Sequence, residues 1–417
     1  MQERKSTLVA ALPELLAAVA LAAVLAGAAA AADWPRWRGA EGDGVYRGDD
    51  WSLEKFAGGL EEAWKVDVGA GYSSVAVVEN RLYTMGNENN TDYIGCINTE
   101  NGEVIWTFSY PCKPPQYPGP RATPFVNGGR VYTFSSAGHL FCLDALKGSK
   151  IWGVNVAESM GVKNPKWGFA GSPVVDGGMV IVNAGRHGMA FNKQTGEKIW
   201  ASAPRIGGYA TPIVYELDGK RRLAIFGEKA VYGVDAEDGK ELWSYPWETS
   251  YDVNAADPIV FDHYCFITSG YNRGATLLDI AGGKAVKVWE TKVLASQFSS
   301  CALIDGYIYG ISGNAGRGVL VCLEAISGEL QWSKDVGFGG LIVADGKIIT
   351  CNESGTVRVV EINTDSYREL ARAESFSPGR GRIWTAPVLA NGRLYIRSST
   401  GGLASYDVSA AAVAARE

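Results

Sequence analysis

Apolar residues along this chain fall into short runs, and successive runs are separated by tight turns rich in Asn, Asp and Gly. Paired apolar runs joined by such turns predict β-hairpins. Eight hairpins of this kind occur, with the sequences VVENRLY, FVNGGRVY, VVDGGMVI, YELDGKRRLAI, VFDHYCFI, LIDGYIYG, VADGKII and LANGRLYI. The pattern therefore predicts an all-β protein built from repeated hairpin units.

A second phrase recurs after the hairpins, in which a Gly turn leads into a strand that carries tryptophan, as in ENGEVIW, QTGEKIW and EDGKELW. These tryptophans are 42 to 48 residues apart, at Trp64, Trp106, Trp152, Trp200, Trp243, Trp289 and Trp332. Spacing of roughly 40 to 50 residues is typical of four-stranded propeller blades. We expect each Trp to cover the neighbouring blade, which is a structural docking role, and the Gly to supply the positive φ of the turn.

The two ends of the chain complement each other. The eighth unit stops after its third strand, LASYDV, whereas EEAWKVDV carries Trp64 ahead of the first hairpin. We predict an eight-bladed β-propeller of four-stranded antiparallel blades in which the N-terminal strand completes the last blade, a closure that leaves no open sheet edge between the ends. The predicted boundaries are a signal peptide at 1–32, an N-terminal extension at 33–59, the propeller at 60–409 and a C-terminal tail at 410–417.

The N-terminal residues have a charged start, an apolar run that is most continuous from Leu15 to Ala26, and small residues before Asp33. This order predicts a secretory signal peptide cleaved at about Ala30 to Ala32, and hence a periplasmic or secreted protein with no membrane span after cleavage. An uncleaved anchor helix is the alternative, although Pro13 and Glu14 interrupt the run. The first cysteine is Cys96, so a lipid-anchored terminus is not expected.

Composition argues against nucleic acid or anionic lipid as partners and against a metal site. The chain has 417 residues, 47% of them hydrophobic, with a formal net charge of -6, which gives no general attraction to nucleic acid or anionic lipid. Seven cysteines leave at least one unpaired, and Cys96, Cys142 and Cys322 hold the same place in different repeats, which favours small buried strand residues. With no paired CxxC spacing and three histidines, no metal site is predicted.

The D-x-x-T/S-G-E/K-x-x-W phrase resembles the pyrroloquinoline quinone (PQQ) repeat. That repeat occurs in quinoprotein alcohol dehydrogenases and in non-catalytic BamB-type outer-membrane assembly factors. The segment DWPRWRG, residues 33–39, also resembles the mature start of secreted bacterial propellers with such repeats. The resemblance implies a propeller over nearly the whole chain after residue 60 and leaves the function open.

The long and chemically mixed loops share one face of the predicted ring, and residues just ahead of each inner strand are expected to surround the channel mouth on that face. Those residues are Tyr72, Arg121, Phe169, Tyr209, Asn254, Phe298, Phe338 and Trp384. Neighbouring loops add Trp167, Tyr251, Asp252, Asp257, Arg273, Gln297 and Arg382. This set suits a planar or sugar-like ligand or a protein partner. In the structural alternative, the aromatic residues plug the channel and the two aspartates cap loops.

A dehydrogenase would need PQQ above the channel, calcium held by side-chain oxygens and an aspartate to take the alcohol proton. Asp252, Asn254, Asp257 and Asn272 supply oxygens, but the adjacent cysteine pair of many such enzymes is absent and no catalytic residue is assigned. PQQ and Ca²⁺ are therefore expected only under this alternative. Our interpretation is an exported, non-catalytic monomer that binds a small molecule, glycan or protein on its long-loop face. A PQQ-dependent alcohol dehydrogenase is the alternative, and a carbohydrate-active or carbohydrate-binding propeller is the second alternative.

Overall fold

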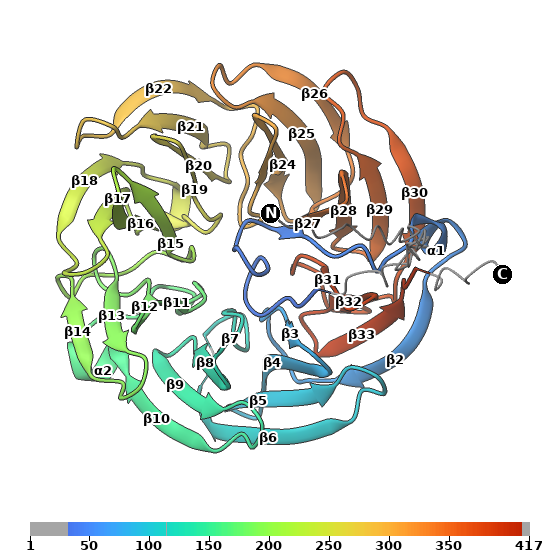
Figure 1. Cartoon of the computed structure of the whole chain (residues 1–417), viewed down its shortest axis with the longest axis horizontal. Coiled ribbons are helices and arrows are strands. Elements are labelled where there is room, and N and C mark those ends of the chain that lie inside the picture. Colours follow the sequence, from blue (N-terminus) through green and yellow to red (C-terminus); the bar gives the residue numbers. More distant parts are fainter. Residues whose placement is uncertain (1–31, 114, 411–417) are drawn as a thin grey trace, which may run out of the picture.

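Eight antiparallel sheets form a ring around a central channel in the computed structural model, which describes residues 32–113 and 115–410 (Figure 1). The predicted eight-bladed β-propeller is confirmed. Each blade has four strands, ordered from the channel to the perimeter, and one blade carries a fifth. The predicted signal peptide lies outside the described residues except for residue 32. The predicted C-terminal tail lies outside them except for residue 410.

The strands of each blade follow one another in the chain. The first four blades, written from inner to outer strand, are β3 (Ala76–Val78), β4 (Arg81–Glu88), β5 (Thr91–Asn98), β6 (Val104–Pro111); β7 (Phe125–Asn127), β8 (Arg130–Phe134), β9 (His139–Asp144), β10 (Lys150–Asn155); β11 (Val174–Asp176), β12 (Met179–Val182), β13 (Met189–Asn192), β14 (Lys198–Ala201); β15 (Ile213–Leu217), β16 (Lys220–Phe226), β17 (Ala230–Asp235), β18 (Glu241–Pro246). The next three are β19 (Ile259–Phe261), β20 (Tyr264–Ser269), β21 (Gly274–Asp279), β22 (Val286–Thr291); β23 (Ala302–Ile304), β24 (Tyr307–Asn314), β25 (Arg317–Glu324), β26 (Leu330–Asp335); β27 (Gly339–Ala344), β28 (Lys347–Asn352), β29 (Thr356–Glu361), β30 (Glu369–Glu374).

The eighth blade joins the two ends of the propeller. Its inner strands are β31 (Val388–Ala390), β32 (Arg393–Arg397) and β33 (Gly402–Asp407), and its outer strand is β2 (Glu61–Asp67), which pairs antiparallel with β33. Arg397 then crosses from β32 to the first blade, where its Nη1 donates to Ser73 O at 2.6 Å and to Thr84 Oγ1 at 2.8 Å. The predicted closure by the N-terminal strand is therefore confirmed.

In six of the eight blades, a tryptophan on the outer strand donates a hydrogen bond to the next blade; β30 has no tryptophan, and Trp243 Nε1 has no partner among the described residues. The indole Nε1 of Trp152 donates to Lys193 O in the following blade at 3.1 Å, and its ring lies over Gly196. A Cβ added at Gly196 would lie 2.6 Å from the ring, and φ there is +77°. Only glycine combines this close approach with a left-handed backbone. Equivalent Nε1 bonds to a carbonyl of the next blade are made by Trp64, Trp106, Trp200, Trp289 and Trp332.

The N-terminal extension occupies the middle of the ring, as the blue segment of Figure 1 shows. Trp34 forms a two-way backbone bridge with Val77 of β3, and β1 (Val45–Tyr46) pairs in parallel with β27 as the fifth strand of the seventh blade. Asp33 accepts from the backbone N of Glu79 in the β3–β4 turn, so the extension lies against the short-turn face. Three short helical segments complete the fold, α1 (Leu53–Ala57), α2 (Val156–Met160) and the 3₁₀ turn η1 (Ser250–Asp252).

The core consists of apolar side chains packed between neighbouring blades. In middle strands such as β12, three of the four residues are buried, whereas in outer strands such as β14 Trp200 alone is buried. All seven cysteines are buried and free, and burial raises the pKa of Cys265 to about 12. In the described part of the chain, no helix combines the length and apolar character needed to cross a membrane.

Candidate functional site

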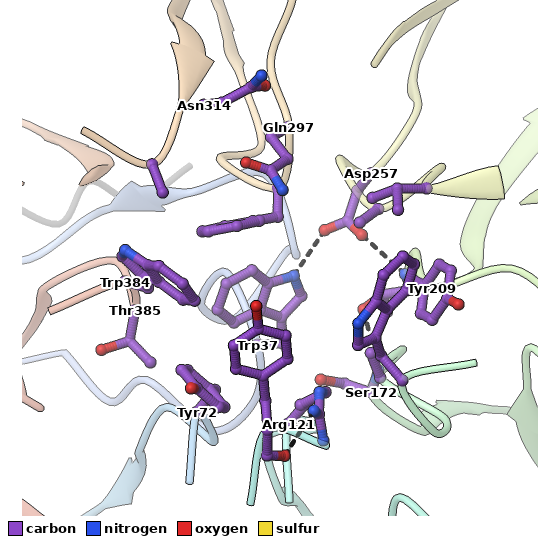
Figure 2. A pocket seen from close by; sticks show the side chains of 18 of the residues that line it. Trp37, Tyr72, Arg121, Ser172, Tyr209, Asp257, Gln297, Asn314, Trp384 and Thr385 are labelled. Atoms are coloured by element: carbon purple, nitrogen blue, oxygen red, sulfur yellow. Dashed lines mark hydrogen bonds between the residues drawn. The ribbon is translucent and has the colours of Figure 1, made fainter. Parts of the chain in front are cut away.

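A cavity of about 400 Å³ lies at the channel mouth on the long-loop face. Its walls come from residues ahead of the inner strands and from the loops between second and third strands (Figure 2). Most of its large side chains are aromatic: Trp37, Tyr72, Tyr117, Trp167, Tyr209, Tyr271, Phe298 and Trp384. The polar lining includes Arg121, Ser172, Thr211, Asp257, Gln297, Asn314 and Thr385.

The aromatic side chains form two groups. Tyr72 stacks on Trp384 with ring centroids 5.5 Å apart and an interplanar angle of 22°, and Phe298 packs against the same indole at 5.3 Å. On the third to fifth blades, Trp167 contacts Tyr209 at 6.0 Å. These contacts hold flat apolar surfaces in fixed orientations, which suits a planar apolar ligand.

A belt of hydrogen bonds fixes the inner strands below the cavity. At one repeat position, a backbone N–H donates to a side-chain oxygen of the same position in the next blade. This inner belt runs from Ser74 to Thr123 (3.2 Å), Ser172 (2.9 Å), Thr211 (3.1 Å), Asp257 (2.7 Å) and Ser300 (3.0 Å). These bonds link the residues that precede six successive inner strands below the channel mouth.

Asp257 has a second bond that the Ser and Thr residues of the belt lack. Its Oδ1 accepts from Thr211 N within the belt, and its Oδ2 accepts from Trp37 Nε1 at 2.6 Å. Figure 2 shows both bonds, with the Trp37 indole at the centre of the cavity. The extension thus enters from the short-turn face and places Trp37 as the cavity floor.

Burial raises the pKa of the Asp257 carboxyl, which is 3% exposed. The positive charge of Arg38 and the bonds from Trp37, Thr211 and Ser300 oppose this rise. Both carboxyl oxygens are already hydrogen-bonded. The chemistry of Asp257 is therefore that of an anchor for the extension.

Eight of the predicted site residues line the cavity together: Tyr72, Arg121, Trp167, Tyr209, Asp257, Gln297, Phe298 and Trp384. Tyr251 lies at the rim, 60% exposed, with its ring against Trp167 and Tyr271. Asp252 is its neighbour in η1 and is partly exposed. Sequence position thus predicted a large part of the mouth.

The remaining predicted residues do not line the cavity. Phe169 and Phe338 are buried, because their rings pack against Phe134 and Phe298. Asn254 is also buried, and its Nδ2 donates to three backbone carbonyls, those of Gly227, Glu228 and Trp247.

The two predicted arginines also lie elsewhere. Arg273 lies 3.4 Å from the centroid of the Trp247 ring and pairs with Glu290 at 2.6 Å. Arg382 is exposed; its backbone N donates to Ser399 Oγ at 3.0 Å, and its carbonyl accepts from Ser399 N at 2.8 Å. The side chain of a residue ahead of an inner strand can therefore face the core or the side of a blade. Its position in the sequence does not show which of these it faces.

Several lining residues were missed from the sequence, among them Trp37, Tyr117, Tyr271 and Asn314. Tyr117, Tyr271 and Asn314 belong to the long, chemically mixed loops, and no periodic sequence position marks them. Trp37 belongs to the DWPRWRG segment, where two tryptophans and two arginines in seven residues were the available signal. Its contact with Asp257 joins positions 220 residues apart, which no local pattern reveals.

The fold and the repeat define a β-propeller of the PQQ-repeat class. A family profile described as outer membrane protein assembly factor BamB matches residues 57–162, 90–334 and 316–414, and the chain belongs to this family. A curated relative, outer membrane protein assembly factor BamB of Nitrosomonas eutropha, is 23% identical over 248 residues. That match covers 55% of this chain and 55% of the relative, so the chain spans about half the length of the curated relative.

Solved structures share the fold. BamB from Moraxella catarrhalis superposes with a TM-score of 0.60 at 18% identity, covering 84% of this chain and 97% of that one. The quinohemoprotein alcohol dehydrogenase of Comamonas testosteroni gives a TM-score of 0.66 at 15% identity, covering 91% of this chain and 81% of that one. At these identities the likeness concerns the fold alone.

The cavity residues do not fit a quinone cofactor held with calcium. Calcium takes six to eight oxygen ligands, with carboxylates prominent among them. Among the described residues, Asp257 is the one carboxylate that lines the cavity, and both its oxygens accept bonds from the protein. Within residues 32–113 and 115–410, no three His, Cys, Asp or Glu side chains are grouped so as to hold a metal.

Proposed function

We propose that this protein is an exported, non-catalytic β-propeller that binds a ligand or partner in the aromatic cavity of its long-loop face. One observation carries the proposal. The channel mouth is a cavity of about 400 Å³ with aromatic walls, and the one carboxylate among its described lining residues is bonded to the protein's own Trp37 and Thr211. Such a site can bind, but it has no free acid or base aimed at a substrate.

The family supports a binding role. The matched profile and the curated relative are described as an outer membrane protein assembly factor, which is a role in assembly. We infer from this description that the present chain also acts by binding another molecule. The signal-like N-terminal sequence supports export, to the periplasm or beyond.

The quinoprotein alternative is supported by the fold shared with the Comamonas testosteroni dehydrogenase. The donor set at the channel mouth opposes it, because Asp257 has no free oxygen for a metal and no second carboxylate lines the cavity. We therefore expect no alcohol oxidation in the presence of PQQ and calcium. The carbohydrate alternative is supported by the stacked Tyr72 and Trp384 rings, which can also face a sugar.

Binding and catalysis can be tested on the same purified protein. Calorimetric titration with 2-naphthamide, a planar uncharged probe, should give saturable binding at one site. Trp384→Ala should weaken that binding by about tenfold, since a packed aromatic wall contributes on the order of 1.4 kcal/mol. Tyr307→Ala is the matched control, because Tyr307 is also partly exposed but begins β24 on the short-turn face.

Alcohol-dependent dye reduction with added PQQ and Ca²⁺ should not exceed the rate without PQQ. Turnover above that rate would overturn the non-catalytic assignment. If Trp384→Ala leaves naphthamide binding unchanged, the cavity is not the binding site. If the protein binds cellobiose and not naphthamide, the carbohydrate alternative is favoured.

A further inference from the structure

Arg121 is the one arginine or lysine in the cavity lining over the part of the chain that the structure describes. Its Nη1 donates to Gly119 O at 2.9 Å and its Nη2 to Tyr117 O at 2.8 Å, and its guanidinium lies 5.5 Å from the centre of the Tyr72 ring. These partners are a pair of neutral carbonyls and an aromatic face. Figure 2 shows the guanidinium beside Tyr72 at the edge of the cavity.

Within the described chain Arg121 forms no ion pair, and the charge of Asp92 acts on it only from beyond ion-pair distance. Burial lowers the pKa of Arg121 to about 10, so the group remains charged at neutral pH while losing part of its hydration. A partly desolvated cation without an anion is unfavourable, and it gains most from a ligand that carries the anion. Guanidinium groups bind carboxylates through two parallel hydrogen bonds.

The rest of the cavity indicates the other parts of the ligand. The Tyr72, Trp384 and Phe298 rings form a flat apolar wall next to Arg121. Gln297 lies on the opposite side in Figure 2, and its buried Oε1 has no hydrogen-bond partner.

We infer that the cavity binds a carboxylate on a flat apolar body, with the carboxylate on Arg121 and the body against Tyr72 and Trp384. The inference deepens the proposed function and rests on it. The same chemistry is carried by a free aromatic acid and by the C-terminal carboxylate of a protein that ends in an aromatic residue.

Matched pairs of probes test the charge. Calorimetric titrations should compare 2-naphthoate with 2-naphthamide, which have the same rings and differ in the charge. We expect naphthoate to bind at least tenfold more tightly, as hydrogen bonds to charged groups are worth about 1.5–3 kcal/mol. Arg121→Gln should abolish this preference, and Arg121→Lys should keep part of it, because lysine retains the charge without the planar fork. Arg382→Gln, a change at an exposed arginine outside the cavity, should leave the preference intact.

The outcomes separate the two proposals. Equal affinity for both probes, or a preference that survives Arg121→Gln, overturns the carboxylate assignment and leaves cavity binding in place. Failure of both probes to bind contradicts the proposed function as well. If Arg121→Gln does not fold, the affinities of the wild-type protein and of Arg121→Lys for naphthoate and naphthamide still test the carboxylate assignment. A second pair, N-acetyltryptophan and its amide, tests the source, since tighter binding of this acid than of naphthoate would favour a chain terminus.

Discussion

Asp257 occupies a position that serine or threonine holds in the other blades of the inner belt. A hydroxyl there would satisfy the Thr211 N–H equally well, so the belt alone does not require an acid. The extra oxygen accepts from Trp37, and the nearby Arg38 reduces the cost of burying the charge. A residue that looks catalytic by type thus has a structural reason for its charge.

Replacement of Trp37 by Phe should test this anchor. The change removes the Nε1 donor and leaves a buried carboxylate oxygen without a partner, and we expect a loss of about 2 kcal/mol in the free energy of unfolding. Trp106→Phe is the control, because Trp106 is also half-buried but donates to a neutral carbonyl, that of Ala145. For Trp106→Phe we expect a loss of about 1 kcal/mol in the free energy of unfolding. Urea denaturation measures both, and equal losses would contradict a charged anchor.

At the scale of strands and turns, the repeat carried most of the fold prediction. Eight periodic hairpins and seven spaced tryptophans specify recurring local structure, so strand order, blade number and closure followed from the sequence. The site did not follow as fully. Phe169 and Tyr209 precede inner strands in the same way, yet Phe169 packs into the core and Tyr209 lines the cavity. That difference depends on loop paths, and the paths are set by contacts between blades.

The Trp–Gly contact predicts a difference between two glycines of the third blade. Gly196 has φ +77° with the Trp152 ring 2.6 Å from an added Cβ, whereas Gly177 has φ +52° and open space around it. Gly177→Ala should cost about 1–2 kcal/mol of stability from backbone strain alone. Gly196→Ala should cost about 1–3 kcal/mol more, since the methyl group would displace the indole.

Thermal or urea unfolding of the two variants measures the difference directly. Similar stability losses would mean that the tryptophan adapts without cost. The glycine of the repeated phrase would then serve the turn alone, and blade docking would depend on the indole hydrogen bonds.

At the scale of the whole molecule, two parts of the N-terminal region complete the ring. Strand β2 closes the eighth blade from the perimeter, and the segment around Trp37 closes the channel from the short-turn face. The cavity is therefore a blind pocket, with its floor made by the extension and its walls by loops that precede the inner strands. This arrangement concentrates the molecule's exposed aromatic surface at one end of the channel.

Photolabelling tests most directly whether that end is the binding site. The probe is 4-benzoylbenzoate, an aromatic carboxylate that crosslinks on irradiation, and the labelled peptides are identified by mass spectrometry. We predict labelling near Tyr117, Trp167 and Trp384, competed by 2-naphthoate and reduced in Trp384→Ala. Labelling confined to the outer strands, such as the exposed apolar residues Val104 and Ile105 of β6, would contradict the cavity as the binding site.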